Sequence, residues 1–156
     1  MHKPNRTSPD PAAAPHGCSS FKLRQLSRRA SQHFDHFVGD AGLKTTQYSL
    51  LSHVVRLGPV KPGELAAEMD MDASTLTRNL QPLAAQGWVE IGPGDDGRSR
   101  LVTATALGRE KRSEAQRKWR RGQQAFNERL GEARVARLHA LIDECLELLN
   151  ADDAPA

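Results

Sequence analysis

Residues 71–108, MDASTLTRNLQPLAAQGWVEIGPGDDGRSRLVTATALG, combine a helical pattern with the pattern of a β-hairpin. Their spacing predicts a short helix that ends at Gly87, followed by a strand, a turn rich in Gly and Asp, and a second strand. Leucines recur at helical spacing on one side of the helix, at Leu76, Leu80 and Leu83. The opposite side carries the polar residues Ser74, Thr75, Thr77, Arg78 and Gln81.

This helix has the composition expected of a DNA-reading helix. Its short hydroxyl side chains would allow a close approach to a major groove, while Arg78, Asn79 and Gln81 carry donors and acceptors that suit base edges. Pro82 lies inside the helix and lacks the N–H that would bond to the carbonyl of Arg78, so we expect a bend or a looser helix there.

A second short helix is predicted just upstream, in the segment KPGELAAEM at residues 61–69. Pro62 suits its first turn, where the missing N–H has no cost. The segment Asp70-Met71-Asp72 then interrupts the pattern, and either Asp72 or Ser74 can cap the reading helix. A helix, a tight turn and a second helix make a helix-turn-helix, in which the second helix reads DNA.

The hairpin turn at residues 95–100, DDGRSR, carries Arg98 and Arg100 near its tip. This is the arrangement of a DNA-contacting wing. The two-residue spacing predicts that both arginines point the same way, toward a DNA backbone or minor groove. The competing interpretation is an ordinary hairpin turn with a surface ion pair.

The order ELA…MD.STLTRNL..L…G.VE…DDGRSRLV..T..G resembles the MarR family of winged-helix transcription regulators. The resemblance is detailed from about Leu43 to Arg109 and looser from Ser20 to Asn150. It implies a mainly α fold with a small β-hairpin wing, in which N- and C-terminal helices flank a winged helix-turn-helix core and form a homodimerisation domain. The implied domain layout is a single domain over residues 18–150, with dimerisation helices at 18–42 and 110–150 and the winged helix-turn-helix at 43–109. The remaining segments, 1–17 and 151–156, are expected to be disordered tails.

The resemblance also implies roles for individual residues. Asp96 would orient Arg98, which would enter the minor groove, where negative potential attracts a guanidinium. Gly97 departs from the family pattern, since many relatives carry Arg or another long residue there, and one phosphate contact fewer is expected. The family resemblance further implies a repressor that leaves a palindromic operator when a small aromatic or phenolic effector binds beside the dimer helices. The residues considered for that effector pocket are Arg28, His53 and Trp119.

Both ends of the chain carry apolar helical seams, which predict a homodimer. The first helix, residues 20–38, has its seam at Leu23, Leu26, Ala30, His33 and Phe37. The last helix, residues 132–150, repeats the spacing at Val135, Leu138, Ile142, Cys145 and Leu149. A long helix from Thr105, its expected N-cap, to about Leu130 connects the core to this region, and Gly122 permits close packing there. A further helix is expected at 46–57, capped by Thr45.

Charge is distributed unevenly along the 156 residues, although the formal net charge is only +3. Between Arg98 and Arg121 there are nine Lys or Arg residues against two Glu, whereas residues 138–156 hold five acids and no Lys or Arg. A basic surface that starts at the wing is where phosphates would lie. Its distal part, residues 117–121, is equally well explained as a solvated helix face.

The two cysteines raise an alternative function on the same scaffold, a thiol-based redox or peroxide-sensing repressor. Cys18 directly precedes the first helix, with Ser19 and Ser20 as possible caps, and a helix N-terminus lowers the pKa of a thiol. In the peroxide-sensing branch of the family a reactive cysteine lies near the first helix. Against this, Cys145 lies on an apolar seam and would behave as a small buried hydrophobe.

Other classes of function find little support in the sequence. There is no nucleophile elbow, Gly-rich phosphate loop or His-Glu-x-x-His motif, so no enzyme activity is predicted. His33, Asp35 and His36 lack the partners of a complete metal site, and no metal or cofactor is expected. No apolar run reaches the ~18 residues of a membrane span, and a cytoplasmic protein without disulfides is expected. A second alternative, a non-specific architectural DNA-binding protein, is disfavoured because such proteins have no use for base-reading amides.

Overall fold

The computed structural model of the protein describes residues 15–152. Of the tails expected at residues 1–17 and 151–156, residues 1–14 and 153–156 lie outside the described residues. The described chain forms six α-helices, one 3-10 helix and a two-stranded antiparallel hairpin, which confirms the predicted fold class. In chain order these elements are α1 (Ser19–Val38), η1 (Gly39–Ala41), α2 (Thr45–Leu57), α3 (Pro62–Glu68), α4 (Ala73–Ala85), β1 (Val89–Pro93), β2 (Arg100–Ala104), α5 (Ala106–Leu130) and α6 (Glu132–Asp152).

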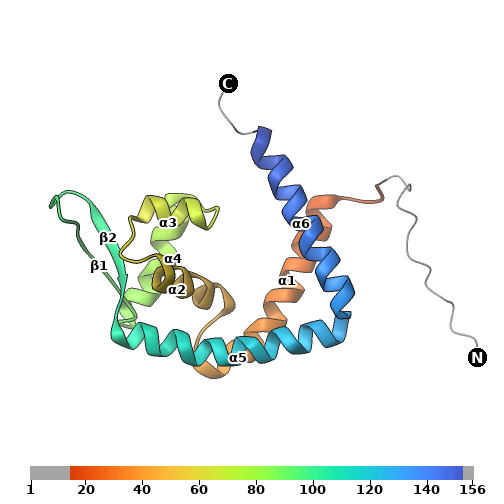
Figure 1. Cartoon of the computed structure of the whole chain (residues 1–156), viewed down its shortest axis with the longest axis horizontal. Coiled ribbons are helices and arrows are strands. Elements are labelled where there is room, and N and C mark those ends of the chain that lie inside the picture. Colours follow the sequence, from red (N-terminus) through yellow and green to blue (C-terminus); the bar gives the residue numbers. More distant parts are fainter. Residues whose placement is uncertain (1–14, 153–156) are drawn as a thin grey trace, which may run out of the picture.

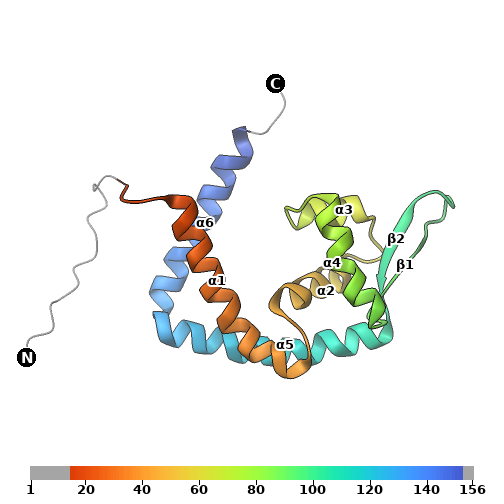
Figure 2. The same cartoon turned by 180° about the vertical axis from the view of Figure 1, so that it is seen from behind.

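The long helix α5 joins two parts of the molecule (Figure 1). Helices α2, α3 and α4 and the hairpin lie over its N-terminal half, whereas α1 and α6 lie at its other end, as the reverse view also shows (Figure 2). Of the helices in the described segment, none is long and apolar enough to cross a membrane.

The predicted leucine stripe of α4 forms the centre of the core. Leu76, Leu80 and Leu83 are each at most 1% exposed and pack with buried residues of α2 and α3, including Leu51 and Leu65. Burying each of these side chains contributes roughly 1.5–3 kcal/mol relative to exposure. This packing holds α4 so that its polar side remains on the surface.

The helix starts follow the local predictions only in part. Pro62 occupies the first turn of α3, Asp72 caps α4 and Thr105 caps α5, as predicted. The predicted cap of α2 is wrong: Thr45 is already helical and Lys44 is the N-cap residue. The N–H of Thr45 instead donates to Oδ1 of Asp35 in α1, over 2.6 Å, a contact that no local pattern reveals.

The two chain ends show smaller differences from expectation. At α1 the N-cap residue is Cys18, and both serines proposed as caps, Ser19 and Ser20, lie inside the helix. At the other end, α6 continues to Asp152, so two residues assigned to the C-terminal tail are helical.

Aromatic rings fill the junction between α1 and α5, where Gly122 allows the close approach predicted for it. A Cβ atom at this position would lie 3.1 Å from the ring of Phe37 and 3.2 Å from that of Phe34. Trp119 stacks between Phe34 and Tyr48, with ring centroids 6.3 and 6.0 Å away respectively. This junction connects α1 and α5 to α2 of the core.

Candidate nucleic-acid interface

The start of α4 is organised by the carboxylate of Asp72. It accepts hydrogen bonds from the hydroxyl of Ser74 at 2.6 Å and from both the backbone N–H and the hydroxyl of Thr75 at 2.7 Å. These bonds hold the pKa of Asp72 well below its usual range. Because both hydroxyl protons are committed to Asp72, Ser74 and Thr75 present acceptors to any partner above the helix.

The exposed face of α4 brings together Ser74, Thr77, Arg78 and Gln81. The hydroxyl of Thr77 donates to the carbonyl of Ala73 at 2.8 Å. The guanidinium of Arg78 makes one long contact, 3.5 Å from Nη2 to the hydroxyl of Thr75, and is exposed. Arg78 and Gln81 are therefore the long polar side chains on this face that can reach base edges.

Asn79, also predicted to read bases, lies elsewhere. It is half-buried, its Nδ2 lies 3.9 Å from the sulfur of Met71, and it lines a small cavity of about 150 Å³ with residues of α2 and with Pro82. One residue advances a helix by 100°, which takes Asn79 away from the face of Arg78. Asn79 thus belongs to the contact between α4 and α2.

Pro82 lies inside α4 and does not end the helix. The proline supplies no N–H to the carbonyl of Arg78. The helix nevertheless continues to Ala85, and the carbonyl of Pro82 accepts a 3.1 Å hydrogen bond from the N–H of Gln86. Pro82 therefore lies within the last turns of a helix that is not interrupted there.

The wing is an antiparallel hairpin in which Val89 pairs with Ala104 and Pro93 with Arg100. Strand β2 begins at Arg100, so Arg98 lies in the turn. The strand-alternation argument for a common direction of the two arginines is therefore wrong, because it applies only within a strand. Both side chains are exposed.

Asp96 shapes the wing tip through the backbone. Its Oδ1 accepts hydrogen bonds from the N–H of Arg98 at 3.0 Å and from the N–H and hydroxyl of Ser99 at 2.8 and 2.7 Å. These bonds lower the pKa of Asp96 to about 2, with the side-chain bond from Ser99 as the largest cause. Gly97 supplies the left-handed φ of +66° that the turn needs. Among the described residues no ion pair joins Asp96 to Arg98, so Asp96 positions the backbone of that arginine.

Part of the basic surface on α5 is neutralised within the chain. The Nζ of Lys111 donates to the carbonyl of Ala41 at 3.1 Å and lies 2.8 Å from the carboxylate of Glu114. Lys118 lies 3.9 Å from Asp40. The exposed arginines of this surface are Arg98, Arg100, Arg109, Arg117, Arg120 and Arg121. The charge available to phosphates is therefore smaller than the residue count indicates.

The three residues considered for an effector pocket lie in different surroundings. Arg28 is exposed on α1, Trp119 is in the aromatic junction, and His53 lines a cavity of about 270 Å³ between α2 and α5. Ser52 and Arg112 also line this cavity, and their Oγ and Nε atoms are buried without hydrogen-bond partners. Sequence analysis missed both residues, because their burial depends on how α2 and α5 meet.

Neither cysteine is buried: Cys18 and Cys145 are exposed free thiols in the single chain. The expectation that Cys145 is a buried hydrophobe thus does not hold for one chain alone. His33 lies in the aromatic junction, with its Nε2 2.8 Å from the carbonyl of Gly122. The described residues contain no cluster of three or more potential metal ligands.

In sequence and fold the chain is similar to known transcription regulators. The family model described as MarR family matches residues 41–99. The M. tuberculosis transcriptional regulator MosR, solved in complex with DNA, is 30% identical with a TM-score of 0.72, over 85% of this chain and 98% of that one. A mutant MarR from E. coli, complexed with operator DNA, is 22% identical with a TM-score of 0.73 over 81% and 92% of the two chains, a likeness of fold.

A curated relative covers less of the chain. The uncharacterized HTH-type transcriptional regulator YwoH of Bacillus subtilis is 30% identical over 82 residues, which make up 53% of this chain and 57% of that protein. The match thus spans little more than half of that relative's length. Since helix-turn-helix, wing and flanking helices occur here in the order of these regulators, the chain belongs to the MarR family of winged helix-turn-helix transcription regulators.

Proposed function

We propose that the protein represses transcription by binding a palindromic DNA operator as a homodimer. In this proposal α4 of each protomer lies in a major groove, and the wing lies beside it. The main support for the proposal is the exposed face of α4, where Arg78 and Gln81 lie beside short hydroxyl side chains. Buried leucines on the opposite side hold this helix against the core. The DNA complex of MosR, a relative at 30% identity, supports it.

A footprint on the promoter beside the coding gene tests this function, with random DNA of equal length as the control. We expect a protected palindrome whose half-site centres lie about one helical turn, ~10–10.5 base pairs, or a multiple of that apart. Equal affinity for both DNAs would contradict the proposal and favour an architectural protein.

We expect the wing to contribute to DNA affinity by contacting phosphates. Replacing Arg98 by Ala is expected to weaken binding to many sequences alike and to reduce the slope of log K against log salt by roughly one unit, because one phosphate contact is lost. Asp96→Ala should cause a smaller loss, since Asp96 holds only the backbone of the turn. Measuring the affinity of both variants across a salt series checks this. If both variants bind DNA as the native protein does at every salt concentration, the hairpin does not touch DNA. If Arg98→Ala instead loses affinity only for sites with a narrow A·T minor groove, Arg98 lies in that groove.

We assign the effector site to the cavity that His53 lines. A small aromatic carboxylate or phenolate could accept hydrogen bonds from Ser52 Oγ and Arg112 Nε, both buried without partners. Calorimetric titration with benzoate is expected to show binding that Arg112→Gln weakens at least roughly tenfold, the loss of one charge-assisted bond. Arg28→Gln, exposed on α1, serves as the control. If both variants bind benzoate equally well, this cavity is not the effector site.

The alternative on this scaffold is redox sensing through Cys18, which is favoured by the exposure of this thiol at the start of α1. Hydrogen peroxide would oxidise its thiolate to sulfenate and be reduced to water. Peroxide that releases the native protein from its operator, but not the Cys18→Ser variant, would establish this mode. Release of both variants alike would exclude Cys18 as the sensor.

A further inference from the structure

The hydroxyl groups at the start of α4 have a fixed polarity. The hydroxyl of Ser74 donates to Oδ1 of Asp72 at 2.6 Å, and the hydroxyl of Thr75 donates to Oδ2 at 2.7 Å. These bonds, with that from Ser74 as the largest cause, lower the pKa of Asp72, so this group is an ionised carboxylate at neutral pH. An ionised carboxylate only accepts hydrogen bonds, and both hydroxyl protons are therefore directed at Asp72.

Ser74 and Thr77 differ in how firmly their protons are held, although both side chains are exposed. The proton of Thr77 is directed at the neutral carbonyl of Ala73, at 2.8 Å. Hydrogen bonds to an ionised group are roughly twice as strong as bonds between neutral groups. Thr77 can therefore turn its proton toward DNA at a smaller cost, whereas Ser74 presents only the lone pairs of its oxygen.

Ser74 shares the exposed face of α4 with Arg78 and Gln81, which follow it at helical spacing. In a major groove, adenine and cytosine present an amino group that donates, whereas guanine and thymine present carbonyl oxygens that accept. A carbonyl oxygen placed against the hydroxyl oxygen of Ser74 would leave two desolvated acceptors without a donor, which is unfavourable. The oxygen of Ser74 thus favours a base with an amino group.

A DNA phosphate is a less suitable partner for Ser74. Phosphate oxygens only accept hydrogen bonds, so they need the proton that Asp72 holds. They are also negatively charged, and the carboxylate of Asp72 repels them at short range. Bases with an amino group meet neither obstacle.

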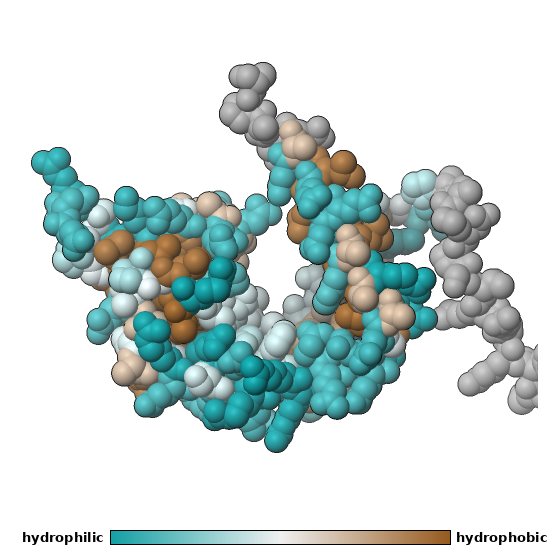
Figure 3. Space-filling model, viewed as in Figure 1, coloured by the Kyte–Doolittle hydropathy of each residue, from teal (hydrophilic) through white to brown (hydrophobic). Residues whose placement is uncertain are grey.

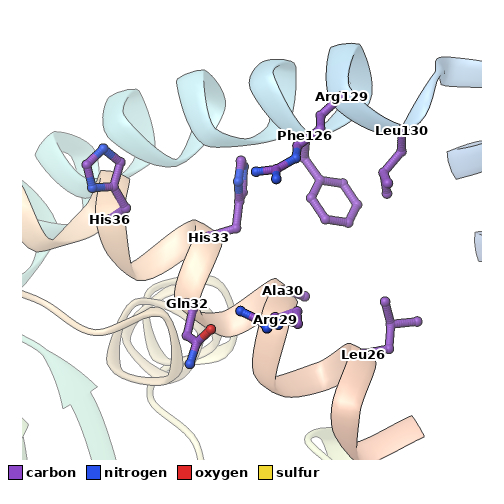
Figure 4. A pocket seen from close by; sticks show the side chains of 9 residues that line it. All are labelled: Leu26, Arg29, Ala30, Gln32, His33, His36, Phe126, Arg129 and Leu130. Carbon is purple, nitrogen blue, oxygen red and sulfur yellow. The ribbon is translucent and has the colours of Figure 1, made fainter. Parts of the chain in front are cut away.

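The exposed face of α4 lies apart from the other prominent surface features of the described chain. Exposed apolar side chains gather along α6, as Figure 3 shows. A cavity of about 640 Å³ lies between α1 and the end of α5, where polar and charged side chains such as Arg29 and His36 line it together with Phe126 (Figure 4). Neither feature includes a residue of α4, so the hydrogen bonds of α4 and its cap set the polarity of this face.

We propose that Ser74 selects a base with an amino group, adenine or cytosine, in each half-site, and that Asp72 is the positioning residue that keeps its hydroxyl an acceptor. The inference rests on the proposed function, in which α4 lies in the major groove, and adds the class of base read at the start of the helix. Arg78, about one turn further along, only donates and suits the acceptors of guanine.

Competition titrations over all single base changes of the operator test this selection in the native protein and in Ser74→Ala. The position whose base preference changes in Ser74→Ala is the one that Ser74 faces. There the native protein should bind adenine or cytosine at least roughly fivefold more tightly than guanine or thymine, because an unpaired acceptor is avoided. In Ser74→Ala this ratio should fall below about twofold, because the oxygen is gone.

Base analogues isolate the contribution of the amino group. Replacing the adenine at that position by purine, or the cytosine by 2-pyrimidinone, removes the amino group alone. Binding by the native protein should weaken at least roughly threefold more than binding by Ser74→Ala, since only the native protein loses a hydrogen bond. The analogue weakens the base pair equally for both proteins, so this comparison cancels that effect.

Asp72→Asn tests the positioning role. Asn caps helices as well as Asp does, so the start of α4 is retained. Its neutral oxygen holds the proton of Ser74 less firmly, and the preference for adenine or cytosine should fall at least roughly threefold at that position alone. A merely structural role would instead lower affinity for all sequences alike. Glu64→Gln, which removes a negative charge from an exposed position in the first turn of α3, is the control and should keep the preference.

Three outcomes would overturn the selection. Guanine or thymine could be preferred at the position that Ser74 faces, or Ser74→Ala could change no preference while Arg78→Ala still changes its own. In both cases α4 remains the helix that reads DNA. If Asp72→Asn changes a preference that Ser74→Ala leaves intact, Asp72 reads the base itself. If Arg78→Ala and Ser74→Ala both leave affinity and preference unchanged, the proposed role of α4 fails as well.

Discussion

Replacing Ile142 by Asp is expected to dissociate the dimer at micromolar concentration. Ile142 lies on the apolar stripe of α6 and is 40% exposed in the single chain, so a second copy would cover it. An unpaired carboxylate in that contact would cost several kcal/mol, since no partner compensates its lost hydration. Light scattering measures the resulting mass, and a charge at half-buried Leu138 should act in the same way.

A suitable control is Ala140→Asp, which adds the same charge to an exposed position on the polar side of α6. This variant should remain dimeric. A monomeric mass for the native protein would contradict the interface and, with it, the twofold operator.

The Ile142→Asp variant should also lose most of its operator affinity. Two linked reading helices bind with an effective concentration that one helix lacks, a gain of roughly 10²–10⁴ in affinity. A mobility-shift titration with the palindromic operator measures this loss. Unchanged affinity for a monomeric variant would show that one protomer alone reads the site.

The second large effect is expected in the reading helix. Arg78→Ala should weaken specific binding by ~1–3 kcal/mol and relax the preference at one base position in each half-site, because a bidentate guanidinium contact is lost. Competition titrations across operators with single base changes would measure both quantities.

The neighbouring residue provides the control for this prediction. Asn79→Ala removes a shorter polar side chain from the half-buried side of α4, where Asn79 contacts Met71. Base preference should then be unchanged. If Arg78→Ala leaves affinity and selectivity intact, α4 is not the helix that reads DNA.

Much of the architecture was predictable from the sequence because it depends on local physics. A helix face repeats every three to four residues, so the leucines of α4 identified the buried side directly. Caps act over three residues, and for that reason Thr105 was identified as a cap and Asp72 as one of two candidates. The turn with two arginines similarly predicted a hairpin, which the structure contains.

The candidate site was predictable to a smaller extent. Most of the polar face of α4 is where the periodicity placed it, whereas half-buried Asn79 lines a cavity together with residues of α2. The strand position assumed for Arg98 was also wrong, since β2 begins only at Arg100 and hydrogen bonds to Asp96 shape the turn.

Local sequence patterns were enough to identify the helical segments, the polar side of α4 and the apolar seams of the two end helices. Three features became visible only in the folded chain: Asp35 accepts a hydrogen bond from the first N–H of α2, Ser52 and Arg112 line one cavity, and a cavity lies between α1 and α5. The two groups of features differ in how far apart in the sequence the interacting residues lie. Helical periodicity and capping act between residues a few positions apart, whereas a cavity or a distant hydrogen bond exists only once separate helices have packed together.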